Sequence, residues 1–218
     1  MKSPVLLRQT LLVMPTAWVI SGGARFGDPW HPFAETSAEL RSALEQRGWA
    51  VEMEDDADAA LAALIHQPLP SLLVVNIGWY GPDRFTDPAT DGLVSALERG
   101  LPTLLVHSTL TAFPEWPLWH EIAGGGWTYG STYHPEYGPA VAVADPNHPL
   151  TAGLDELAIA DERYTKMWVD PSSRVFLRPR SWGGSPIVAD TLGHNAASYQ
   201  ATGRATLLQR ELDWLSHQ

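Results

Sequence analysis

The sequence predicts an α/β fold in which a central, mainly parallel sheet is doubly wound, with helices on both of its faces. Strand-like and helix-like segments alternate through the first half of the chain, as expected of a parallel sheet. Two strand segments, Ser71–Asn76 and Leu101–His107, are largely apolar, which is typical of strands buried on both faces. No linker, repeat or low-complexity run interrupts the 218 residues, so we expect one domain over residues 1–218.

The first half supplies the individual elements of this sheet. We expect its strands at Ala17–Ile20, Ala50–Met53, Ser71–Asn76 and Leu101–His107. Thr36 and Glu39 have the spacing of a capping box and predict a helix that Gly48 ends. The next helix is expected to begin at an acidic group, Asp55, Asp56 and Asp58, which suits a helix N-terminus. A third helix is expected at Asp87–Arg99, before Gly100.

The second half differs in composition, with Trp, Tyr, Gly and Pro concentrated between Phe113 and Tyr137. Trp116–Ile122 is the one helix expected there, and Ala201–His217 is expected to close the chain as a helix. Short strands are expected at Pro139–Val143, Tyr164–Val169, Arg174–Leu177 and Pro186–Val188.

Composition excludes several classes of function. Fourteen basic against 25 acidic residues leave a net charge of −11, which disfavours binding to nucleic acid or to an anionic membrane surface. The absence of cysteine excludes disulfides, thiolate metal ligands and a cysteine nucleophile. No apolar run approaches the ~20 residues of a membrane span.

The N-terminus has the superficial look of a signal peptide. Arg8, Gln9 and Pro15 interrupt its apolar run, and no A-x-A-like cleavage site follows. We therefore expect a cytoplasmic protein, and the sequence leaves a homo-oligomer open.

Polar residues and glycines follow the predicted strands at the edge where ligands bind in open α/β sheets. The candidates are Gly22, Gly23, Asn76, Trp79, His107, His194 and Asn195. Each also has a plainer interpretation: a tight turn for the glycine pair, packing for Trp79, and a structural role for an isolated histidine. Ser108 and Thr109 are possible hydroxyl nucleophiles, but the G-x-S-x-G pattern is missing.

Several motifs occur in a recognisable order along the chain. A glycine pair leads through a loop bearing His31 into the first helix, and a later strand ends in His107. A D-x-x-H-P turn at Asp145–Pro149 is followed by the acidic pair Asp161-Glu162 and Tyr164. The series ends in Leu192-Gly193-His194. In this order and spacing the motifs resemble the ThuA-like (trehalose-utilisation) family, whose fold is that of the class I glutamine amidotransferases.

The resemblance implies a function in the catabolism of trehalose and related sugars, through oxidised (keto) sugars, without glutaminase activity. His107 takes the position at which an amidotransferase carries its nucleophilic cysteine, although Leu105-Val106-His107 replaces the family's Gly-Leu-His. We expect His107, Glu162 and His194 to be acid/base groups, with His107 and His194 facing each other across the cleft. The expected substrate-binding residues are Gly22, Gly23, His31, Asn76, Trp79, His134, Asp161, Tyr164 and Asn195.

Three hypotheses stay open at this point. The first is an enzyme that acts on a carbohydrate or keto-sugar, held by loop aromatics such as Trp30, Trp127 and Tyr129. The second is a sugar-binding or regulatory protein that has lost the chemistry of the fold. The third is a metal-dependent version of the first, in which His107, His134 and His194 converge on zinc or a similar divalent ion.

Overall fold

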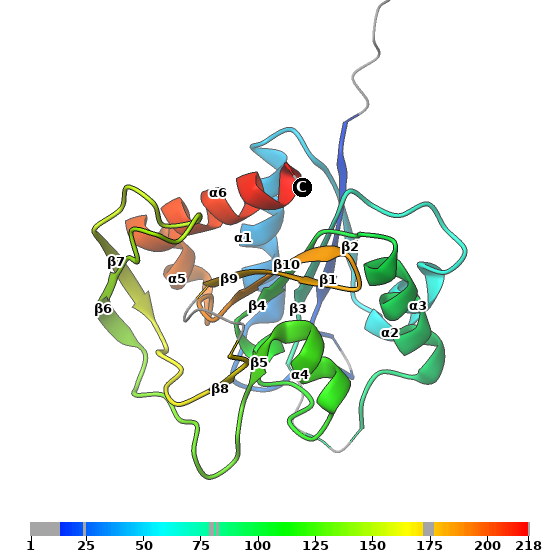
Figure 1. Ribbon diagram of the computed structural model, residues 1–218, viewed down its shortest axis with the longest axis horizontal. Helices are drawn as coiled ribbons and strands as arrows, with labels where there is room; N and C mark the ends of the chain where they lie inside the picture. Colours follow the sequence, from blue (N-terminus) through cyan, green and yellow to red (C-terminus); the bar gives the residue numbers. More distant parts are fainter. Residues whose placement is uncertain (1–13, 24, 79–80, 82, 172–176, 218) are drawn as a thin grey trace, which may run out of the picture.

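A six-stranded sheet forms the centre of the molecule (Figure 1). The computed structural model describes residues 14–23, 25–78, 81, 83–171 and 177–217. The sheet order is β2-β1-β3-β4-β10-β9, and its strands are β1 Thr16–Ser21, β2 Ala50–Glu54, β3 Leu72–Asn76, β4 Thr103–Val106, β9 Leu177–Trp182 and β10 Ser185–Asp190. All neighbours from β2 to β10 are parallel, and β9 alone runs antiparallel to its neighbour. The predicted mainly parallel sheet is confirmed.

Helices cover both faces of this sheet, as predicted. They are α1 Phe33–Glu45, α2 Ala57–Ala63, α3 Asp87–Glu98, α4 Pro117–Ala123, α5 Ala196–Gln200 and α6 Thr202–Ser216. Side chains alternate along each strand, so Trp18 and Ile20 of β1 pack with α2, α3 and α4, while Ala17 and Val19 pack with α1, α5 and α6. The two groups of helices lie on opposite sides of the sheet in Figure 1.

The start of α1 differs from the prediction. The helix begins at Phe33, with Pro32 at the N-cap, and no side chain caps it. Thr36 lies inside the helix, where its hydroxyl donates to the carbonyls of Pro32 and Phe33 instead of forming a capping box with Glu39. Burial of the Phe33 ring accounts for the earlier start, because the ring packs into the core next to Gly22.

The acidic start of α2 is confirmed. Asp56 is its N-cap and accepts a hydrogen bond from the Ala59 backbone N–H at 3.0 Å. Gly48 and Gly100 follow the first and third helices with φ of 81° and 87°, the left-handed conformation that suits glycine at a helix end.

The second half contains two small two-stranded sheets. β5 (Gly125–Gly126) pairs with β8 (Trp168–Val169), and β6 (Gly138–Val143) pairs with β7 (Glu156–Asp161). The strand expected at Tyr164–Val169 is thus shorter than predicted. The sequence patterns did not predict β5, β7 or α5. Most of the strand expected at Arg174–Leu177 lies outside the described residues, and β9 continues from Leu177 to Trp182, beyond the expected end.

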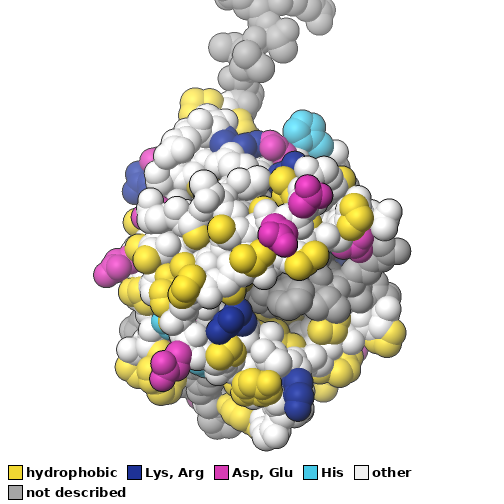
Figure 2. Space-filling view, turned by 90° about the vertical axis from the view of Figure 1, so that its left-hand side faces the viewer, with side chains coloured by type: hydrophobic (Ala, Val, Ile, Leu, Met, Phe, Trp, Pro, Cys, Tyr) yellow, Lys and Arg dark blue, Asp and Glu magenta, His cyan; other side chains and the backbone are white. Residues whose placement is uncertain are grey.

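The β6–β7 hairpin lies against α6 at the left of Figure 1. Its turn is the D-x-x-H-P motif, in which Asp145 accepts the Asn147 backbone N–H and Nδ1 of His148 accepts that of Leu150. His148 is buried there, which favours the structural interpretation of this histidine. Figure 2 faces this side of the molecule and shows hydrophobic side chains scattered among charged ones; Val141 and Val143 of β6 are exposed.

None of the helices among the described residues combines the length and the apolar character that a membrane crossing requires.

A buried charge cluster joins β10 to α6. Nη2 of Arg204 lies 2.6 Å from Oδ2 of Asp190, and Nη1 lies 3.7 Å from Oε2 of Glu211; all three side chains are fully buried. The Arg204 guanidinium also lies over the ring of Tyr199, 4.8 Å from its centroid. Burial and the neighbouring Asp190 raise the pKa of Glu211 well above its usual range. Burial also raises the pKa of Asp190, but Arg204 opposes that rise. Because the guanidinium lies closer to Asp190 than to Glu211, we infer that Asp190 is the ionised carboxylate and Glu211 the protonated one.

This assignment predicts opposite outcomes for two substitutions in the cluster. Arg204→Met should lower the free energy of unfolding by about 3–5 kcal/mol, because it leaves Asp190 buried without a counter-charge. Glu211→Gln should change it by less than about 1 kcal/mol, because the amide resembles the neutral acid in shape. Urea unfolding of the wild type and both variants measures the difference, and equal losses would show that Glu211 is ionised.

Candidate functional site

The carboxyl ends of β1, β3, β4 and β10 lie on one edge of the sheet, because these strands are parallel. His107 follows β4 directly and opens a short 3-10 helix, His107–Leu110. Its φ is 48°, a left-handed conformation that is uncommon for a residue other than glycine. Such strained turns between strand and helix present a functional side chain at the sheet edge in many α/β enzymes.

The turn at His107 is held by the hydroxyls that follow it. Ser108 donates to the carbonyl of Ile77, and Thr109 donates to that of Val75 and accepts the Ile77 N–H, each at 2.9 Å. Both side chains are buried. These hydroxyls are engaged in fixing the backbone, which argues against the hydroxyl-nucleophile interpretation.

His194 reaches the same edge from β10 through a glycine turn. Gly193 has φ of 125°, and its N–H and that of His194 donate to the carboxylate of Asp161 at 2.8 and 3.2 Å. Asn195 is the N-cap of α5 and forms a capping box with Ser198. Asp161 and Asn195 therefore hold the loop that carries His194.

Glu162 lies among three imidazoles. Its Oε2 is 3.3 Å from Nδ1 of His194 and 3.7 Å from Nε2 of His107, and its Oε1 is 3.4 Å from Nδ1 of His134. The His194 nitrogen is at ion-pair distance from this carboxylate, yet it is buried and has no aligned hydrogen bond. The ring centroids of His107 and His194 are 5.5 Å apart, so the expected juxtaposition is present, with Glu162 next to both.

His31 completes the group from the loop before α1. Its Nδ1 lies 2.8 Å from Oδ2 of Asp28, and its Nε2 is buried and has no hydrogen-bond partner within the described ranges. Its ring lies 5.0 Å from that of His107 and 4.9 Å from that of His194 between centroids. His31, His107, Glu162 and His194 each offer one donor atom, and these atoms all lie within 4.8 Å of one another. We call these four residues the donor cluster.

The tautomer of His107 follows from its neighbours. Its Nδ1 lies 2.8 Å from the Thr191 carbonyl, which can only accept, so Nδ1 carries the proton. Nε2 then accepts from the Tyr164 hydroxyl at 2.9 Å, and the Tyr164 ring stacks on the imidazole at 4.6 Å.

The charges in the cluster follow from burial and pairing. Burial alone would raise the pKa of Glu162, but the surrounding imidazoles outweigh it and hold that pKa well below its usual range. The Glu162 carboxylate raises the pKa of His194. Burial lowers the pKa of His31 despite the neighbouring Asp28. Near neutral pH the cluster therefore contains an ionised carboxylate and a neutral His31.

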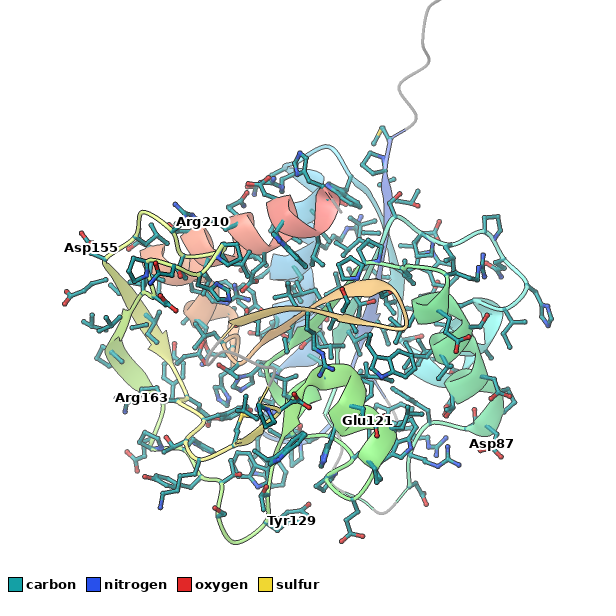
Figure 3. All side chains as sticks on the ribbon, viewed as in Figure 1. Asp87, Glu121, Tyr129, Asp155, Arg163 and Arg210 are labelled. Atoms are coloured by element: carbon teal, nitrogen blue, oxygen red, sulfur yellow. The ribbon has the colours of Figure 1, made fainter. Side chains whose placement is uncertain are left out.

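A cavity of about 630 Å³ opens over this cluster. Its wall is largely aromatic; the lining residues are Trp30, His31, Thr111, Trp127, Tyr129, His134, Glu162, Tyr164 and His194. Trp30 and Tyr129 are 64% and 58% exposed and so form the rim. Figure 3 shows Tyr129 on the loop that follows β5.

Five of the predicted substrate-binding residues that the structure describes lie outside the cavity lining. Asp161 and Asn195 hold the loop of His194. Gly22, Gly23 and Asn76 support the strands. A Cβ on Gly22 would lie 2.5 Å from the Phe33 ring, and one on Gly23 would lie 2.6 Å from the Asp55 carbonyl oxygen. The Asn76 amide donates to the hydroxyls of Thr36 and Ser37, both at 2.9 Å. Packing thus accounts for these residues, and Trp79 lies outside the described residues.

The donor cluster differs from the expected metal-ligand set of His107, His134 and His194. His134 lines the cavity, but its side chain is 37% exposed and its Nδ1 lies 3.0 Å from the Pro135 carbonyl. His134 does not belong to the donor cluster, and His31 stands in its place. Sequence reasoning also missed Asp28, whose position three residues before His31 was the available signal.

Comparison with known proteins agrees with this fold. The sequence profile of the ThuA family, described as trehalose utilisation, matches residues 19–215. No curated protein sequence is significantly similar to the chain.

Solved structures extend the comparison. A ThuA-like protein from Parabacteroides merdae has 18% identity and a TM-score of 0.74, over 94% of this chain and 91% of its own. A second, from Bacteroides uniformis, has 14% identity and a TM-score of 0.68 (98% and 95%). Cytoplasmic protein STM1381 of Salmonella typhimurium LT2 has 15% identity and a TM-score of 0.63 (93% and 99%). At such identities these likenesses concern the fold alone.

The profile covers nearly the whole sheet and every residue of the donor cluster. The chain belongs to the ThuA (trehalose utilisation) family.

Proposed function

We propose that this chain is an enzyme that acts on a small polyhydroxylated substrate, a keto-sugar of the kind produced in trehalose-type catabolism. One observation carries the proposal: an ionised carboxylate and several imidazoles converge at the floor of a cavity with aromatic walls. The family description supports the class of substrate. We further propose a cytoplasmic reaction, in line with the description of the Salmonella structure as a cytoplasmic protein.

The cavity suits a sugar in two respects. Trp30, Trp127 and Tyr129 offer aromatic faces that can stack on the C–H surfaces of a sugar ring. The imidazoles and the carboxylate beneath them can bind hydroxyl and carbonyl groups. A volume of about 630 Å³ lies within the usual range for small-molecule sites.

The residues at the base of the cavity favour proton transfer next to a carbonyl group. A keto group acidifies the neighbouring C–H bonds, so the reaction needs a proton acceptor and a group that polarises the carbonyl oxygen. His107, Glu162 and His194 can supply both functions, and the Tyr164 hydroxyl is a further donor beside His107. A sugar-binding or regulatory protein without catalysis is the alternative, and it would bind the same ligands without forming product.

Aromatic stacking makes Trp30 a selective test of substrate binding. Trp30→Ala should weaken binding of the best keto-sugar by about 2- to 10-fold, if stacking on the ring contributes as much as an aromatic pair does, about 0.5–1.5 kcal/mol. Its melting temperature should hardly change, because the side chain is 64% exposed. Titration calorimetry with keto derivatives of trehalose and glucose, and with the parent sugars, measures the loss. Trp168→Ala is the matched control, since this ring is 43% exposed and lies outside the cavity lining; equal losses in both variants would contradict the assignment.

Two histidine substitutions separate function from structure. His194→Ala should reduce turnover by 100-fold or more with little change in melting temperature, because Asp161 holds the loop through backbone N–H groups that the substitution keeps. His148→Ala should retain turnover and lose about 2 kcal/mol of stability, because it leaves a cavity in a buried turn. Turnover is followed by NMR of the sugar, with unfolding measured in parallel. Binding without product in the wild type would favour the non-catalytic alternative.

Glutamine should not be a substrate. The chain has no cysteine, and the family resemblance implies that His107 takes the position of the amidotransferase nucleophile. The purified protein should release no ammonia from glutamine above the rate in buffer, and iodoacetamide should leave its activity unchanged. Ammonia release that follows the protein through purification would disprove this prediction.

A further inference from the structure

The donor cluster contains a buried nitrogen that no described residue satisfies. Nε2 of His31 has no hydrogen-bond partner among the described residues, although its Nδ1 is held by Asp28. Buried polar atoms in native structures are nearly always paired, so an unpaired one needs an explanation. The His31 ring lies about 5 Å from the rings of His107 and His194, so the three imidazoles surround one small space.

The outer nitrogens of two of these rings are fixed in the manner of metal ligands. Nδ1 of His31 faces the Asp28 carboxylate, and Nδ1 of His107 faces the Thr191 carbonyl, each at 2.8 Å. Histidines that bind metals usually donate their second ring N–H to a carboxylate or a backbone carbonyl, which orients the ring and leaves the other lone pair for the metal. Asp28 is itself fixed, since its Oδ1 accepts the backbone N–H groups of Trp30 and His31.

The distances fit a single ion. In a tetrahedral centre with bonds of about 2.1 Å, the ligand atoms lie roughly 3.4 Å apart. Oε2 of Glu162 is 3.3 Å from His194 Nδ1 and 3.7 Å from His107 Nε2, and no two donor atoms of the cluster are more than 4.8 Å apart. The most widely separated pair would have to approach by about 1.4 Å, from at most 4.8 Å to roughly 3.4 Å, to share one centre.

We propose that His31, His107, His194 and Glu162 bind one divalent first-row transition metal such as Zn²⁺. Three imidazoles favour such ions over Mg²⁺ and Ca²⁺, which prefer oxygen ligands. Asp28 and the Thr191 carbonyl are positioning groups. The Tyr164 hydroxyl is not one of the proposed ligands. Its hydrogen bond to Nε2 of His107 breaks when the ion binds, and the lone pair of that nitrogen then binds the metal.

A bound metal would also take part in the reaction, an inference that rests on the proposed function. His31, Glu162 and His194 all line the cavity, so a substrate carbonyl can reach the ion, which would polarise it. Because the ligands are then committed to the metal, proton transfer passes to the remaining groups of the wall, His134 and Tyr164. His134 lies 3.4 Å from Glu162 and is exposed to the cavity.

Metal binding can be measured without any sugar. Tag-free protein is treated with a chelator, dialysed, and titrated with Zn²⁺, Co²⁺ and Mg²⁺ by calorimetry, with metal content measured by mass spectrometry. We expect one equivalent of Zn²⁺ or Co²⁺, a rise in melting temperature on binding, a visible Co²⁺ spectrum, and no heat from Mg²⁺. Less than 0.1 equivalent of Zn²⁺ and Co²⁺ retained by the wild type would overturn the proposal.

Variants locate the site. His31→Ala should lose at least 100-fold in Zn²⁺ affinity, and Asp28→Asn about 10- to 100-fold, because Asp28 acts through His31. His134→Ala is the matched control from the same cavity and should stay within 3-fold of the wild type. A loss in His134→Ala equal to that in His31→Ala would overturn the ligand assignment. If His31→Ala does not fold, the wild-type stoichiometry and the Co²⁺ spectrum still decide whether a metal site exists.

The two proposals fail in different ways. Metal binding without turnover of any keto-sugar would contradict the proposed function and leave the metal site standing. Full turnover by protein shown to be metal-free would overturn the metal site and leave the function standing.

Discussion

The site depends on one buried carboxylate, that of Asp161. It is 1% exposed and accepts the backbone N–H groups of Glu162, Gly193 and His194 at 2.9, 2.8 and 3.2 Å. Asp161 ends β7 of the small hairpin sheet, whereas His194 follows β10 of the central sheet. These hydrogen bonds therefore join two separate sheets and set the 3.3 Å separation between Glu162 and His194. Charge-assisted hydrogen bonds of this kind are strong, which suits a contact that positions two reactive groups.

A second constraint is the strained turn at His107. A left-handed φ at a residue other than glycine costs free energy and persists only where the surroundings enforce it. Here the enforcement comes from Ser108 and Thr109, whose hydroxyls are hydrogen-bonded to the main chain at the end of β3. The Thr191 carbonyl and the Tyr164 hydroxyl then fix the ring from both sides. The strain is thus offset by contacts with three neighbouring segments, and the imidazole is presented in one orientation and one tautomer.

Much of this arrangement could be predicted from local sequence. Apolar strand runs and the rule that parallel strands end at one edge bring Asn76, His107 and His194 together without any knowledge of the tertiary structure. The strand β7 was missed although Leu157 and Ile159 alternate with more exposed residues, because its run is short and ends in acidic residues. The sequence could not predict which distant residues meet in the donor cluster, for a different reason. The choice between His31 and His134 as a donor depends on how two loops fold over the edge, and spacing along the chain does not encode that.

The role of the Tyr164 hydroxyl depends on whether the donor cluster holds a metal. Its ring is buried and stacked on His107, so the hydroxyl has little freedom except to rotate towards or away from Nε2. That hydroxyl satisfies the Nε2 lone pair of His107, whereas Nε2 of His31 has no hydrogen-bond partner in the described part of the chain. Under the proposed metal binding, a cation would satisfy both nitrogens and leave the hydroxyl available to a ligand in the cavity that Tyr164 lines. The same side chain would then stabilise the metal-free cluster and, once a metal is bound, contact the substrate.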